Sequence, residues 1–568
     1  MYDVLIKKGN LADGSGKACH VADIAVKDET IVAIGSDLQG DAQKIIDADG
    51  LIVSPGFIDN HSHSDFGIVG KYRFDNMVEQ GITTEVVGQC GATLAPATYE
   101  IVKQSAQEFG FTEEDVKFYS EKLGTFEDYL TYLDSIDLGD NWAVFVGHAT
   151  IREYVLGFEN RPPSPKELEQ MKDLVRQAME AGALGVSAGL IYPPGAFANT
   201  DELVALLKVA AEYGGSYTTH MRSEGGTILE SIEEALEIGE RAGVPVNISH
   251  LKVGGKDNWH KLDAVFELIE NAQSKGMKVR ADMYPYLAGS TALMAALPNK
   301  FAAVGPEKAV ENLKNRDFRK EVWQELQTGT GFENLIEYCG FEGIMVVTAS
   351  VTKDLIGRYG ADIAEERKSD PFDVFCDIIV ENNGQTFAAY FMRQEEQVTK
   401  QFARPYVMGG TDGGIESSSF PIFHPRHIGT FPQQIVSIEE AVHKFSFLPA
   451  DMAGLKTKGL IKEGYDADIT IFDLDTLTDH ADYVNPGAKN EGMKYVVING
   501  VIAVEDDRFT GRHAGKVLRT DSNPSGLYRR SKELKGTRDE NTETYRTGGH
   551  YRIRYNPVTK SLYSHYHR

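Results

Sequence analysis

The side chains with the clearest chemical potential are histidines that follow short apolar segments. His61 and His63 come after LIVSPGFIDN, and residues two apart in a strand point to the same side, so both imidazoles would face one way. His220 ends SYTTH and His250 ends PVNISH. A single such histidine is often a buried residue bonded to backbone, but two at the ends of consecutive strands favour a metal site.

A thiol and a carboxylate occupy comparable positions, Cys90 in VVGQCGATLAP and Asp412 in MGGTDGG. Alone, the cysteine could be a small buried hydrophobe and the aspartate part of a turn. Beside a divalent metal the thiol would ionise, and it could bridge two ions or complete one tetrahedral site. Imidazole, thiolate and carboxylate ligands suit zinc better than magnesium or calcium. The sequence therefore predicts a zinc site built from His61, His63, Cys90, His220, His250 and Asp412.

Zinc in such a site would polarise a carbonyl group and lower the pKa of a water molecule towards ~7. Asp412 could take a proton from that water and deliver it to a departing nitrogen. The expected chemistry is hydrolysis of an amide-like C–N bond.

Alternating strands and helices must position these ligands. Apolar segments such as GITTEVVG and GSYTTH alternate with helical patterns such as SPKELEQMKDLVRQAMEAG over most of residues 55–454. This pattern indicates a parallel α/β barrel or a doubly wound sheet. A barrel gathers all strand C-terminal ends onto one face, so six candidate ligands at such ends favour the barrel. Residues 287–347 fit the alternation poorly and are interpreted as an inserted lid subdomain.

The two ends of the chain differ from this central part. Residues 1–54 and 455–519 read as short strands that form one small β domain, although a separate sandwich at each end is an alternative. Residues 520–568 form a basic extension with six tyrosines after Gly526. Its alternating HYRIRY and SLYSHY predict a hairpin. We expect this extension to dock on the acidic body or on a neighbouring subunit, which would give self-association.

Composition excludes several classes of protein. The 568 residues carry a formal charge of −26, which argues against nucleic acid as a partner. No signal segment and no apolar stretch of membrane-spanning length is visible, so no membrane association is expected. Four scattered cysteines do not form a disulfide framework, and a cytoplasmic location is the default expectation.

Several motifs together resemble the D-aminoacylase (N-acyl-D-amino-acid deacylase) family of the amidohydrolase superfamily. They include PGFIDNHSHSD, GITTEVVGQCGATLAP, GALGVSAGLIYPPG, THMRSEG, ISHLKVGG, DMYPYLAGST, GGTDGG and HPRHIGTFP, from about Asp3 to Arg519. The resemblance implies a distorted TIM (β/α)8 barrel, a small β-sandwich domain formed by both terminal segments, and an inserted subdomain. It also implies a tight zinc site at Cys90, His220 and His250, and a weaker second site at His61, His63 and Asp412. GALGVSAG lacks the lysine that bridges metals in many other amidohydrolases, which argues against a hydantoinase or dihydroorotase.

The resemblance further implies a substrate, an N-acyl-D-amino acid, whose α-carboxylate lies among Lys252, Tyr284, Ser290 and Arg426. Two cations and two hydroxyls make a physically sensible anion receptor. The apolar TALMAALP after Ser290 favours a neutral or hydrophobic side chain on the substrate. Arg393 stands where the family more often has methionine, and we expect it at a solvent-exposed helix start. Two alternatives stay open: a related amidohydrolase acting on a cyclic amide, dipeptide or other D-amino-acid derivative, and a metal-holding relative without activity.

Overall fold

The computed structural model describes residues 1–69, 75–104, 111–329, 331–414, 435–483, 485 and 487–520, together with three short strands nearer the C-terminus. Within the unit Met1–Gly526, parallel strands close into a barrel. In chain order they are β6 (Phe57–Asp59) with β7 (Ser62–His63), β8 (Ile82–Val87), β9 (Asn141–Val144) with β10 (Val146–Gly147), β11 (Gly185–Gly189), β12 (Ser216–His220), β13 (Val246–Ile248), β14 (Val279–Met283), and β18 (Val407–Gly409) with β19 (Gly413–Gly414). Neighbouring strands pair in parallel, and β19 pairs with β7, which joins the last position to the first. The expected TIM barrel is confirmed.

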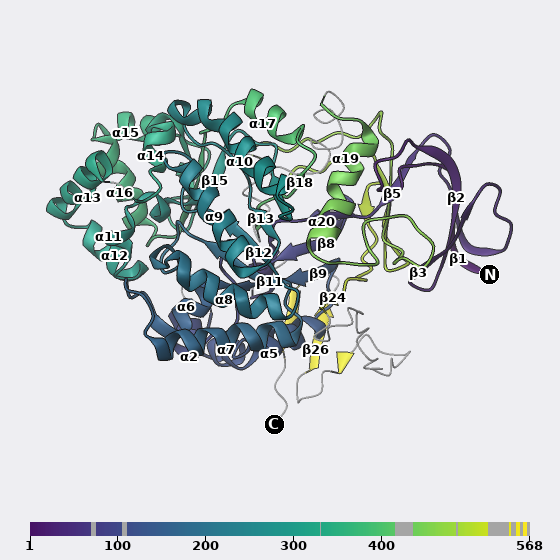
Figure 1. The fold of residues 1–568 in the computed structure, drawn as a ribbon, viewed down its shortest axis with the longest axis horizontal. Helices are drawn as coiled ribbons and strands as arrows, with labels where there is room; N and C mark the ends of the chain where they lie inside the picture. The colour runs from purple at the N-terminus through teal and green to yellow at the C-terminus, as the bar shows by residue number, and fades with distance from the viewer. Residues whose placement is uncertain are drawn as a thin grey trace. The chain divides into compact units, whose positions relative to one another are not determined.

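Amphipathic helices run along the outside of these strands (Figure 1). In α7 (Pro165–Ala181), Ser164 and Glu167 form a capping box, and Gly182 ends the helix in a left-handed conformation with φ 110°. The buried face of α7 includes Met171, Val175 and Ala178, spaced as one side of a helix requires. The other helices of the barrel region are α1 (Asp75–Val78), α2 (Tyr99–Gln104), α4 (Glu113–Lys122), α5 (Phe126–Asp134), α6 (His148–Leu156), α8 (Thr200–Glu212), α9 (Ile228–Ala242), α10 (Leu262–Ser274), α17 (Glu395–Phe402), α19 (Ile438–Phe445) and α20 (Phe447–Met452).

A nine-stranded sheet combines both ends of the main unit. Its strands are β1 (Tyr2–Leu11), β2 (His20–Lys27), β3 (Thr30–Gly35), β4 (Ala42–Asp47) and β5 (Ile52–Pro55) from the N-terminal part, and β20 (Ile469–Phe472), β21 (Met493–Ile498), β22 (Val501–Glu505) and β23 (Arg508–Phe509) from the C-terminal part. β20 pairs antiparallel with β5, so the two parts make one sheet rather than a separate sandwich at each end. Beyond it, β24 (Val517–Leu518) pairs in parallel with barrel strand β9.

An insert between β14 and β18 has a hydrophobic core of its own. Its antiparallel sheet consists of β15 (Gly289–Ala292), β17 (Thr386–Tyr390) and β16 (Ile344–Ala349), in that order. Its helices are α11 (Asn299–Ala302), α12 (Pro306–Leu313), α13 (Arg316–Thr328), α14 (Leu335–Cys339), α15 (Gly360–Arg367) and α16 (Pro371–Glu381). Buried core residues run from Leu293 to Met392, so the insert extends well past the boundary at 347 that the sequence suggested.

A second unit, Leu527–Arg568, contains a small antiparallel sheet of β25 (Tyr545–Arg546), β26 (Arg552–Asn556) and β27 (Ser561–Ser564). β26 and β27 pair from Asn556 opposite Ser561, which is the hairpin that the alternating sequence predicted. Across the described parts of the chain, the helices are too short or too polar to cross a membrane.

Candidate metal centre

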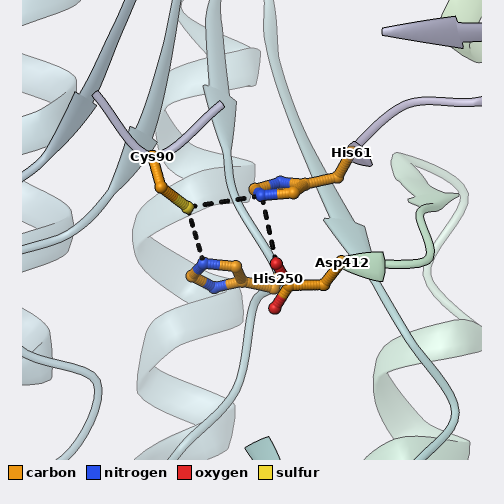
Figure 2. A group of neighbouring side chains, drawn as sticks. All are labelled: His61, Cys90, His250 and Asp412. Carbon is orange, nitrogen blue, oxygen red and sulfur yellow. Dashed lines mark hydrogen bonds and ion pairs between the residues drawn. The ribbon is translucent and has the colours of Figure 1, made fainter. Parts of the chain in front are cut away.

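The thiol of Cys90 lies at the centre of a histidine cluster. Cys90 follows strand β8, and its Sγ is 3.3 Å from His61 Nε2, 3.5 Å from His250 Nε2 and 3.8 Å from His220 Nδ1. Figure 2 shows the sulfur pointing between the rings of His61 and His250. All four side chains are buried. Three histidines from different strand ends therefore converge on one sulfur.

Asp412 completes the group from the last strand of the barrel. Its Oδ1 lies 3.4 Å from His61 Nε2 and 3.4 Å from His63 Nε2. The Asp412 amide donates to the His61 carbonyl at 2.8 Å, which fixes its loop against the first strand. The structure thus brings together, at the C-terminal ends of the barrel strands, all six residues that the sequence singled out as ligands.

The spacing of these donors fits zinc. A tetrahedral zinc ion with Zn–S near 2.3 Å and Zn–N near 2.0 Å separates sulfur from nitrogen by roughly 3.5 Å. The Cys90 contacts of 3.3–3.8 Å bracket that value. Although burial opposes ionisation, the charge of His61 and hydrogen bonds with His220 and His250 hold the pKa of Cys90 well below its ordinary value. The thiolate is the form that binds metal.

Backbone geometry at three of these residues is unusual. Cys90, His250 and Asp412 have φ values of 52°, 35° and 51°, in the left-handed region that non-glycine residues rarely adopt. Each such residue costs on the order of 1 kcal/mol or more. The chain therefore turns sharply at the residue where a strand end presents a candidate ligand.

Asp282 contacts two of the clustered histidines, and the sequence patterns did not single it out. It lies on β14, where its Oδ1 accepts from the His250 amide at 2.6 Å and lies 3.3 Å from His61 Nδ1. Its Oδ2 accepts from Asn247 at 2.6 Å and Asn60 at 3.1 Å. A carboxylate that holds the far nitrogen of a ligating histidine orients its ring. The signal available in the sequence was an acidic residue near the end of the seventh strand, in MKVRADMYP.

Glu224 and Lys252 form a buried ion pair beside the same cluster. Lys252 Nζ donates to Glu224 Oε1 at 2.6 Å and lies 2.7 Å from His250 Nδ1. Glu224 Oε2 is 3.7 Å from His220 Nε2. Burial opposes ionisation of Glu224, but Lys252 and the two histidines lower its pKa below the ordinary value. Glu224 lies in the THMRSEG motif, whose local pattern did not predict a role for it. The ammonium of Lys252 donates to this carboxylate.

Tyr192 is a third residue that sequence reasoning missed. It follows β11 in GLIYPPG; its ring centroid is 5.0 Å from that of His220, and its hydroxyl is 3.2 Å from Thr291 Oγ1. Burial and the nearby Cys90 thiolate raise the pKa of Tyr192 well above its ordinary value. Its hydroxyl therefore stays protonated and can donate a hydrogen bond at the mouth of the site.

The residues expected around a substrate carboxylate divide into three cases. Tyr284 is buried, with Lys252 Nζ 5.4 Å from its ring centroid. Ser290, on β15 of the insert, has a buried Oγ without a hydrogen-bond partner among the described residues. Arg426 lies outside the described residues.

Arg393 does stand just before helix α17, but the expected solvent exposure is wrong, since only 5% of the residue is exposed.

Comparison with known proteins places this centre in a family. The model of the amidohydrolase family matches residues 44–345 and 408–504. A D-aminoacylase of Alcaligenes xylosoxydans xylosoxydans is 32% identical over 91% of this chain and 97% of its own length, and an N-acyl-D-glutamate deacylase of the same organism is 31% identical over 92% and 98%. The solved structure of an N-acyl-D-glutamate deacylase from Bordetella bronchiseptica, complexed with zinc and a phosphonate inhibitor, superposes with a TM-score of 0.75 at 30% identity, over 91% of this chain and 99% of that one. The chain belongs to the amidohydrolase family and, within it, to the D-aminoacylases.

Proposed function

We propose that this enzyme hydrolyses N-acyl-D-amino acids to a carboxylate and a free D-amino acid. The observation that carries the proposal is the thiolate of Cys90 in contact with three histidines, opposite the carboxylate of Asp412. Two relatives at 31–32% identity are a D-aminoacylase and an N-acyl-D-glutamate deacylase, which supports the same reaction class.

The proposed cofactor is zinc, held tightly by Cys90, His220 and His250. A second, weaker position would use His61, His63 and Asp412, whose Oδ1 lies 3.4 Å from each imidazole. When bound, zinc would polarise the amide carbonyl and lower the pKa of the attacking water. The ligand atoms of His61, Cys90, His250 and Asp412 lie within 4.8 Å of one another, and Cys90 Sγ is 3.8 Å from His220 Nδ1, which supports a metal ion at this cluster.

Asp412 is the proposed general base and acid. Burial opposes its ionisation, yet the nearby His250 and His63 lower its pKa below the ordinary value, so it is a carboxylate at neutral pH. It would accept a proton from water and return that proton to the departing nitrogen. The protonated Tyr192 hydroxyl would donate to the acyl oxygen as negative charge develops there.

The proposed carboxylate receptor consists of Lys252, Tyr284, Ser290 and Arg426. Ser290 Oγ, buried without a partner among the described residues, supports a polar ligand at that position. After Ser290, Leu293 and Leu297 lie in the core of the insert, and TALMAALP brings no cation to this strand. We therefore propose a substrate with a neutral or hydrophobic D side chain.

A substrate panel at fixed zinc concentration tests these assignments. N-acetyl derivatives of D- and L-methionine, leucine, phenylalanine, glutamate and aspartate are assayed for amine release, beside a hydantoin and a dipeptide. We expect hydrolysis of the neutral D derivatives and little of the L series. Turnover of the hydantoin or the dipeptide, with inert N-acetyl-D-amino acids, would instead establish the alternative amidohydrolase activity.

A further inference from the structure

Arg393 carries a buried positive charge that the proposed reaction does not use. It leaves the insert after β17, and only 5% of the residue is exposed. Its Nη1 donates to the carbonyls of Tyr284 and Tyr286 at 3.0 and 2.9 Å, and its Nη2 donates to Gln401 Oε1 at 2.7 Å. These acceptors are neutral, and no carboxylate among the described residues forms an ion pair with this guanidinium.

Burial of a cation without a bonded counter-ion is unfavourable, because desolvation costs far more than neutral hydrogen bonds return. Burial accordingly lowers the pKa of Arg393 below its ordinary value. The nearby acidic charge is that of Glu224, and that carboxylate already pairs with Lys252. The guanidinium of Arg393 therefore forms its hydrogen bonds to neutral acceptors alone among the described residues.

This buried guanidinium lies beside a residue of the proposed carboxylate receptor. The guanidinium carbon of Arg393 is 5.2 Å from the centroid of the Tyr284 ring, and Lys252 Nζ is 5.4 Å from the same centroid. Gly289, the neighbour of Ser290, approaches the Tyr284 hydroxyl so closely that an added Cβ would lie 3.0 Å from it. Two cations and the start of β15 thus converge on one tyrosine ring.

We infer that Arg393 is a positioning residue that fixes the Tyr284–Tyr286 turn and supplies positive potential for the substrate's carboxylate without touching it. The inference rests on the proposed function for the identity of that carboxylate. Charge acts over several ångströms in a buried site, so a bound carboxylate would add a counter-charge that the hydrogen-bond acceptors of Arg393 among the described residues do not supply. A residue that only clamps the turn would instead affect ligands with a carboxylate and ligands with a carboxamide equally.

Paired ligands separate these roles. Calorimetry on the zinc-loaded enzyme measures the Kd of D-methionine, the product carboxylate, and of D-methioninamide, in which an uncharged carboxamide replaces the carboxylate. In wild type we expect tighter binding of the acid. Arg393→Met is expected to weaken binding of the acid about tenfold, to leave the amide within twofold, and to raise KM for N-acetyl-D-methionine more than it lowers kcat. Arg393→Lys, which keeps the charge, should preserve most of the preference for the acid.

Two controls keep the result interpretable. Lys400→Met removes an exposed positive charge from the neighbouring helix α17 and should leave the Kd of both ligands unchanged. If Arg393→Met does not fold, Arg393→Gln replaces it, because an amide can still donate to the turn carbonyls. Equal weakening of both ligands, or no preference for the acid in wild type, would overturn the inference. A preference for the acid without hydrolysis of any N-acyl-D-amino acid would overturn only the proposed function.

Discussion

Replacement of Asp282 by asparagine tests how far the metal centre depends on its support. The side chain keeps its shape, but one carboxylate oxygen becomes an amide nitrogen. In the wild type, Oδ1 faces the His250 amide and His61 Nδ1, while Oδ2 faces the amide groups of Asn60 and Asn247. In either orientation of the new amide, its NH2 group faces hydrogen-bond donors instead of acceptors. The substitution therefore breaks one complete set of contacts.

The size of the effect follows from those contacts. Loss of hydrogen bonds to a charged acceptor costs about 1.5–3 kcal/mol each, so we expect a decrease of about 3 kcal/mol in the free energy of unfolding after partial relaxation. Loss of a carboxylate that orients a ligating histidine typically weakens metal binding 10–100-fold. That range corresponds to about 1.4–2.7 kcal/mol.

Zinc affinity is measured by competition with a chromophoric chelator, and stability by urea unfolding of the metal-free protein. Asp451→Asn is the matched control, because Asp451 accepts from Arg280 near the opposite end of β14 at 2.6 Å. It should reduce stability slightly and leave zinc affinity unchanged. Zinc affinity of Asp282→Asn within twofold of wild type would refute the orienting role.

Three other outcomes are expected. Asp412→Ala should retain tight zinc in metal analysis but lose turnover, and loss of the tight zinc would show that Asp412 is needed for binding. Burial and the neighbouring Glu224 raise the pKa of Glu333 from 4.5 to about 8, so the native state keeps a proton that the unfolded chain releases between these values. The free energy of unfolding of the wild type should therefore fall across that window. In urea unfolding, the stability of Glu333→Gln relative to wild type should increase from pH 5 to pH 8. The same stability difference between variant and wild type at pH 5 and at pH 8 would contradict this assignment. Truncation after Thr520 keeps the hydrogen bond from the Thr520 amide to the Gly182 carbonyl. If residues 521–568 mediate self-association, this truncation should lower the assembly state measured by light scattering. An unchanged assembly state and unchanged stability would argue against that role.

The clustering of the six proposed ligands was predictable from the sequence because barrel geometry brings all strand C-terminal ends to one face. His220 and His250 end consecutive apolar segments, and a closed parallel barrel must bring such ends to one face. The supporting residues were not accessible in this way. Glu224 and Asp282 act through contacts with side chains from other strands, and no spacing within one segment encodes those contacts.

The error at Arg393 has a similar cause. RQEEQ is polar and precedes a helix, which is the usual composition of a solvated segment. Its burial results from docking of this segment against the turn at Tyr284, more than a hundred residues earlier in the chain. Likewise, the insert ends near Met392 because its last strand, β17, returns to pair with β15, and local composition does not reveal that pairing.

The left-handed backbone at Cys90, His250 and Asp412 costs folding free energy at three residues that are proposed metal ligands. Glycine adopts such φ values without steric penalty, so Asp412→Gly, at a side chain with 14% exposure, should stabilise the metal-free protein by up to ~1 kcal/mol while removing a proposed ligand. A mutant library sorted for heat resistance alone would therefore enrich inactive clones at this position. Directed evolution of this enzyme therefore needs an activity screen at every round, because a thermostabilising substitution at this position would lie inside the proposed reactive centre.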